Sequence, residues 1–147
     1  MDRDELLRVE RDRWNEFDRL VRSVPSDRLD EPTLNPDGWS VKDLLWHMGS
    51  WDDEIADQLE RIRAGTYTGH GWDEDPMNAR YLEEGRRSDA RSARKLCSRA
   101  RERVRSEMDL QADLTEAVED LFSESAYKHM DDHLPELRRF VEGPADR

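Results

Sequence analysis

The chain of 147 residues lacks long apolar runs, regular period-2 alternation and all but one cysteine. The lone cysteine, Cys97, excludes an internal disulfide and a cysteine-rich zinc site, which agrees with a reducing compartment. No run approaches the roughly 18 apolar residues that a membrane span requires, and the opening residues MDRDELLRVERDRW contain no apolar signal segment. We therefore expect a cytoplasmic protein that makes no use of a membrane.

Basic residues are fewer than acidic ones, 24 against 36, and the formal net charge is -12. The summed field repels phosphate backbones and anionic lipids, which disfavours nucleic acid and membranes as partners. Only residues 86–105 are locally basic, and they could bind an anionic cosubstrate, an acidic partner or nucleic acid. No aromatic residue lies between their arginines, which weakens the nucleic-acid alternative. We expect them to pair with the acidic stretch EAVEDLFSES, residues 116–125, in the fold or across a dimer.

Apolar residues recur at helical spacing in four regions, which predicts an all-α protein. The regions are approximately residues 4–24, 41–62, 76–108 and 114–141. Because the connecting segments are short and the length suits one core, we expect a single domain over residues 1–147, folded as a four-helix bundle.

Local signals mark the ends of these helices. Pro25 closes the first helix, and Ser40 is the expected N-cap of the second, with Asp43 in the capping-box position. The glycine in AGTYTG ends the second helix. A glycine and a serine predict a break in the third region near residues 85–89, and an interruption is expected near Ser123 in the fourth.

Three of the four histidines occupy positions from which they can meet. His129 and His133 are four residues apart, so both imidazoles lie on one face of the last helix, where Pro135 should add a kink. His47 lies in the middle of the second helix, on the border of its apolar stripe. If these helices are neighbours, three neutral imidazoles converge, which suits zinc, nickel, copper or iron and leaves coordination positions open. Surface or hydrogen-bonded histidines are the alternative, and we expect His70, between two glycines, to be such a residue.

Aromatic residues lie close to these histidines in the sequence. Trp46 and Trp51 flank His47 and, with Trp72, could line an apolar substrate pocket. The alternative for Trp46 and Trp51 is filling the core, and for Trp72 and Tyr81 it is covering the end of the bundle. The expected rim of this pocket comprises Trp72, Asp75, Asn78 and Tyr81.

The remaining chemically active side chains are expected to have mostly structural roles, although one of the carboxylates near the histidines could serve as a general base. Cys97 lies in an apolar helical stripe and is expected to pack there. Asp131 and Asp132 fall between the two late histidines and should point away from the ligand face. The other carboxylates near the histidines are expected mostly at the solvated surface; they are Asp43, Asp52 and Glu54.

Three stretches carry a resemblance to a known superfamily: GWSVKDLLWHMGSWDDEIADQLERI, GWDEDPMNARYLEE and AYKHMDDHLPELRRF. Together they resemble the DinB-like four-helix-bundle superfamily, which includes maleylpyruvate isomerase-type and bacillithiol-transferase-type proteins. The WSVKDLL and HLPELR stretches are similar to its colibactin self-resistance-like branch. The resemblance implies a metal triad at His47, His129 and His133.

The resemblance also implies a function: a metal-dependent transferase or hydrolase that acts on a small electrophile, with a low-molecular-weight thiol as the nucleophile. It implies one divalent ion, zinc or nickel, and a homodimer. Met130 stands where relatives commonly carry an aromatic residue, and the expected lack of the isomerase's second domain argues against maleylpyruvate as substrate. The alternative is a non-catalytic bundle that binds a small molecule or a partner and holds a structural metal.

Overall fold

The computed structural model describes residues 1–143, and every regular element among them is helical. The predicted all-α class is thereby confirmed. In chain order the elements are α1 (Arg3–Arg22), the 3-10 turn η1 (Ser26–Arg28), α2 (Val41–Ala64), α3 (Glu74–Arg87), α4 (Ala90–Leu110), α5 (Glu116–Ser123), the π turn η2 (Glu124–Lys128) and α6 (His129–Glu142).

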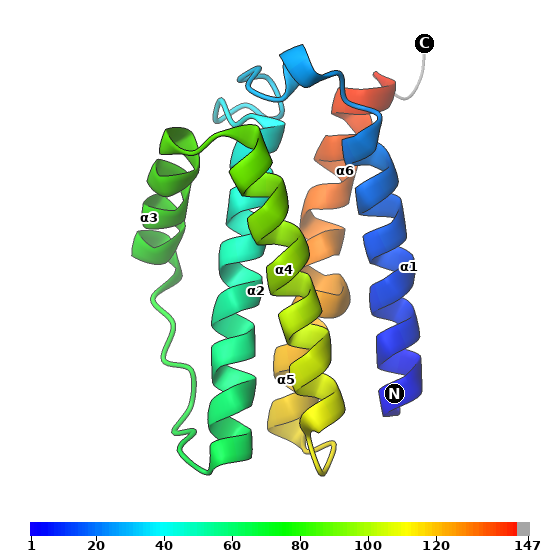
Figure 1. Cartoon of the computed structure of the whole chain (residues 1–147), viewed down its shortest axis with the longest axis vertical. Coiled ribbons are helices and arrows are strands. Elements are labelled where there is room, and N and C mark those ends of the chain that lie inside the picture. Colours follow the sequence, from blue (N-terminus) through cyan, green and yellow to red (C-terminus); the bar gives the residue numbers. More distant parts are fainter. Residues whose placement is uncertain (144–147) are drawn as a thin grey trace.

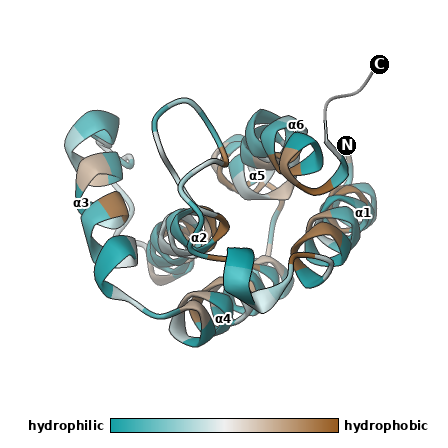
Figure 2. Ribbon diagram, turned by 90° about the horizontal axis from the view of Figure 1, so that it is seen from above, coloured by the Kyte–Doolittle hydropathy of each residue, from teal (hydrophilic) through white to brown (hydrophobic). Residues whose placement is uncertain are grey.

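Four helical rods form the bundle: α1, α2, α4 and the continuous run from α5 through η2 to α6 (Figure 1). The α3 helix lies outside this bundle, beside α2, as the view along the bundle shows (Figure 2). Its separation from α4 follows the predicted break, because α3 ends at Arg87 and Asp89 caps α4 by accepting a hydrogen bond from the Ser92 amide at 2.7 Å. The α3 helix is therefore a peripheral addition to the four rods of the bundle.

The α2 helix has the boundaries that the sequence predicts. Ser40 and Asp43 form a reciprocal capping box, in which each side chain accepts a hydrogen bond from the other residue's amide, at 3.0 and 2.9 Å. The helix ends at Gly65, whose φ of 76° is a left-handed conformation that favours glycine. Asp43 is consequently buried as a cap, which corrects its expected surface position.

Apolar side chains form two clusters along the bundle axis. One is centred on residues such as Phe17, Leu44 and Leu134, and the other on Leu6, Leu59 and Phe122. Cys97 is buried in the first cluster, and burial raises the pKa of its thiol well above the ordinary value. The packing role predicted for this residue therefore agrees with the structure. No helix in the described part of the chain combines the length and apolarity needed to cross a bilayer.

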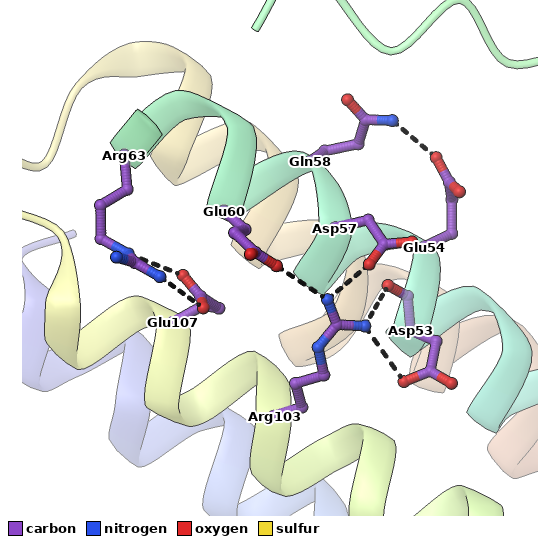
Figure 3. A network of polar contacts seen from close by, with 8 residues as sticks. All are labelled: Asp53, Glu54, Asp57, Gln58, Glu60, Arg63, Arg103 and Glu107. Atoms are coloured by element: carbon purple, nitrogen blue, oxygen red, sulfur yellow. Dashed lines mark hydrogen bonds and ion pairs between the residues drawn. The ribbon is translucent and has the colours of Figure 1, made fainter. Parts of the chain in front are cut away.

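The basic segment pairs with acidic side chains, but with different ones from those expected. Arg103 of α4 contacts three carboxylates on α2, from Asp53, Asp57 and Glu60 (Figure 3). Arg101 and Arg105 both contact the buried carboxylate of Glu10 on α1. The described ion pairs that join this segment to other helices of the bundle thus reach α1 and α2, so the pairing with residues 116–125 that was predicted within the fold is wrong. The alternative, pairing across a dimer, stays a prediction. These arginines tie α4 to its neighbours.

Candidate metal site

Three histidines converge between α2 and α6. The Nε2 atoms of His47 and His129 are 2.9 Å apart, and one nitrogen from each of His47, His129 and His133 lies within 4.8 Å of the others. Zinc-to-imidazole bonds of about 2.0–2.1 Å require ligand nitrogens roughly 3–4 Å apart. The donor set therefore fits a single divalent ion, and the convergence predicted from helical spacing is present.

Two of the imidazoles, those of His47 and His129, are held in the neutral form that can ligate a metal. Burial, and then the neighbouring His133, lowers the pKa of His47 to about 3. Burial, with His47 and His133 beside it, also lowers the pKa of His129 well below its ordinary value. Both rings consequently keep a free nitrogen lone pair near neutral pH.

Two neighbours orient the histidine rings. Nδ1 of His133 lies 2.8 Å from Oε1 of Glu136, which leaves Nε2 as the nitrogen available to a metal. Trp39, which precedes the cap of α2, packs edge-on against His47 with ring centroids 4.9 Å apart and stacks on His133 at 6.1 Å. Sequence reasoning missed Trp39 and Glu136, although Glu136 follows His133 by three residues, a spacing at which helical side chains meet.

A π turn sets the rotation of α6. In η2 the helix contains one extra residue, which rotates everything after it by about 100° relative to an uninterrupted α-helix. Continued from Val118, an unbroken 3.6-residue repeat would place position 129 in the core. Instead Met130 and Leu137 are buried, while His129 and His133 lie beside the core, toward α2. The interruption expected near Ser123 thus directly precedes the histidine pair.

The histidines form one wall of a cavity of about 390 Å³. Two of the three predicted pocket tryptophans line it, and hydrogen bonds hold their rings: Trp51 donates to Asn78 at 2.7 Å, and Trp72 donates to Glu54 at 2.9 Å. The lining residues are Trp39, His47, Trp51, Ile55, His70, Trp72, Glu74, Asn78, Glu124, His129, Asp132 and His133.

Trp46 does not line this cavity, which corrects its predicted place in the pocket. Its ring lies over Gly85 of α3, where an added Cβ would approach the Trp46 Cβ to 2.9 Å, and its indole nitrogen faces Glu84 at 3.4 Å. Trp46 therefore attaches α3 to α2. Of the expected rim, Trp72 and Asn78 line the cavity and Asp75 does not, while Tyr81 is buried behind Trp51 at a centroid distance of 5.6 Å.

The carboxylates near the histidines also differ from expectation. Asp131 pairs with Arg13 of α1 at 2.8 Å and points away from the cavity, as predicted, but Asp132 lines the cavity. Residues three apart in a helix lie on the same face, so the side chain of Asp132 points to the same side as that of His129. Asp52, expected at the surface, is buried.

The cavity surface is acidic and continues into a second hollow. Glu74, Glu124 and Asp132 contribute carboxylates, and neither lysine nor arginine occurs among the described residues that line it. A neighbouring cavity of about 700 Å³ shares His70, Trp72 and Glu124 with the first and has one lysine, paired with Glu124 at 3.7 Å. His70 lies apart from the three-histidine cluster, exposed, with its ring stacked on Trp72.

The all-helical bundle, with three histidines that converge between its second and last rods, fits the class of DinB-like proteins. Within that class, the model of the mycothiol maleylpyruvate isomerase N-terminal domain matches residues 11–119, and the chain belongs to that family. The match includes His47 and ends before His129 and His133. No curated protein and no solved structure matches the chain.

Proposed function

We propose that the protein is a metal-dependent transferase or hydrolase that acts on a small electrophile, with a low-molecular-weight thiol as the preferred nucleophile. The observation that carries the proposal is the convergence of three imidazoles on the wall of a cavity large enough for a small molecule. A bound divalent ion, zinc or nickel, would lower the pKa of a thiol or water and polarise the electrophile.

The donor set supports a catalytic rather than a closed metal site. Structural zinc sites usually have four protein ligands, whereas catalytic sites have three and leave a position for water or substrate. His47, His129 and His133 supply three ligands, and the cavity lies directly beside them. The family's name contains the thiol mycothiol, which supports a thiol as cosubstrate.

The side chains around the site favour a neutral or cationic substrate with an apolar part. Trp51 and Trp72 offer flat apolar surfaces, while the carboxylates of Glu74, Glu124 and Asp132 repel anions. A dicarboxylate such as maleylpyruvate would meet these charges with the bound ion as its cationic partner and with no lysine or arginine among the described lining residues. We therefore place the substrate among uncharged or amine-bearing electrophiles.

Metal content and turnover test the proposal. Purified protein should carry about one equivalent of zinc or nickel by elemental analysis, and His133→Ala should lose it. His70→Ala is the matched control for metal content, since His70 lies outside the cluster. Full occupancy in a triple alanine variant of the three ligands would overturn the site.

Activity is measured by incubating the loaded protein with mycothiol, bacillithiol, glutathione or water and a panel of neutral, cationic and anionic electrophiles. Turnover should disappear with chelation and in His133→Ala, and should be lowest for the anionic members. Full metal occupancy without turnover on any pair would favour a binding protein with a structural metal.

A further inference from the structure

A buried carboxylate and a buried hydroxyl meet next to the histidine cluster. Asp52 lies on α2 and Ser125 on η2, with exposed fractions of 4% and 7%. The Ser125 hydroxyl donates a hydrogen bond of 2.7 Å to Oδ1 of Asp52. Neither side chain lines the cavity of the candidate site, so neither is placed to touch a substrate.

This contact and the histidine contact are successive links between the same two antiparallel rods. Asp52 follows His47 by five residues on α2, and Ser125 precedes His129 by four residues on the last rod. The His47–His129 distance of 2.9 Å and the Ser125–Asp52 distance of 2.7 Å therefore join the rods about one helical turn apart.

Packing alone does not account for a carboxylate at this position. Burial raises the pKa of Asp52 to about 7 even though the Ser125 hydrogen bond opposes the rise. A buried carboxyl costs free energy that an apolar side chain of similar size would not. What the carboxyl provides is a directional acceptor for a residue inside the π turn, and that turn determines the rotation of α6.

We propose that the Asp52–Ser125 hydrogen bond is a positioning device for the metal site. It holds the π turn against α2 in the rotation that brings His129 and His133 to His47. Asp52 and Ser125 act through the backbone of the last rod rather than by contact with metal or substrate. The inference deepens the proposed function and rests on it for the role of the histidines as ligands.

Imidazole spectra of the metal-free protein test the positioning directly. Long-range ¹H–¹⁵N spectra resolve the ring nitrogens of the histidines, and Ser125→Ala should move the signals of His129 and His133. Ser123→Ala is the matched control, because this serine is buried to a similar extent, two residues earlier, and is not the donor to Asp52. Exposed His70 gives a reference signal. Unchanged His129 and His133 signals in Ser125→Ala would overturn the inference.

Metal affinity gives an independent readout. In chelator competition, Ser125→Ala should bind zinc about tenfold more weakly than Ser123→Ala, the scale seen when supporting groups of a metal site are lost. Asp52→Ala should behave like Ser125→Ala, whereas Asp52→Asn keeps the acceptor oxygen and should retain affinity. Equal affinity in Ser125→Ala and Ser123→Ala would refute positioning. A wild-type chain that binds no metal would overturn the proposed function alone, and the imidazole spectra would still decide the role of this contact.

Discussion

Replacing Asp52 by asparagine should change how stability depends on pH. In the folded protein, burial and the nearby carboxylates of Glu10 and Asp53 raise the pKa of Asp52 from 3.8 to about 7, although Ser125 and Arg101 oppose the rise. Between these two values the folded state binds one more proton than the unfolded state. The free energy of unfolding therefore falls as pH rises through this window.

The size of the effect follows from the same two values. A difference of about three pKa units at about 1.4 kcal/mol each gives about 4 kcal/mol. That is a large share of the roughly 5–15 kcal/mol that stabilises a typical domain. Asparagine keeps the acceptor oxygen and does not ionise, so Asp52→Asn should match wild type near pH 4 and exceed its stability by up to about 4 kcal/mol at pH 8.

Urea unfolding monitored by tryptophan fluorescence measures this difference. The titration is done with chelator present, so that metal binding does not contribute to stability. Asp109→Asn, at an exposed position on α4, is the control for removal of one negative charge. A stability difference between Asp52→Asn and wild type that stays constant from pH 4 to pH 8 would refute the reasoning.

Four further predictions concern single contacts and assembly. Glu136→Gln should weaken zinc binding about tenfold in chelator competition, because the carboxylate orients His133, and should leave the helical circular dichroism unchanged. Gly49→Ala should lower the free energy of unfolding by about 1–3 kcal/mol, because its Cβ would lie 2.8 Å from the Leu96 Cγ and 3.0 Å from the α4 backbone. Glu10→Ala should cost about 3–5 kcal/mol by urea unfolding, since it leaves Arg101 and a second arginine without their buried partner; a loss below about 1 kcal/mol would place this pair with ordinary surface ion pairs. The homodimer expected from the family resemblance should appear in sedimentation at micromolar concentration, and a monomer would contradict it.

Local signals made part of this fold predictable. The capping box at Ser40 and Asp43 and the glycine at Gly65 mark the ends of α2 within a few residues of sequence. The four-residue spacing of His129 and His133 places both side chains on one face of the last helix. His47 lies on the border of the apolar stripe of α2, so its side chain faces the interior of the bundle. Each of these properties depends on near neighbours in the chain.

Features that depend on distant partners were not predictable in the same way. Asp52 is buried where its hydrogen-bond partner, Ser125, lies 73 residues away in the sequence. The π turn rotates Asp132 together with the histidines, but no residue type in the sequence marks the place where a helix takes up an extra residue. Trp46 and Trp51 both flank His47 in the sequence and both contact α3, but Trp51 meets Asn78 beside the cavity whereas Trp46 packs on Gly85.

The peripheral position of α3 has a consequence for how the cavity can be entered. The described part of α3 packs mainly on α2, and only Tyr81 and Gly85 of this helix are buried. Elements with few buried contacts open at lower free energy than the core, and their amides exchange with solvent first. Glu74 and Asn78 of α3 line the cavity, whereas the three histidines belong to α2 and α6. Transient detachment of α3 would therefore admit a molecule from the side without changing the relative positions of the three imidazoles.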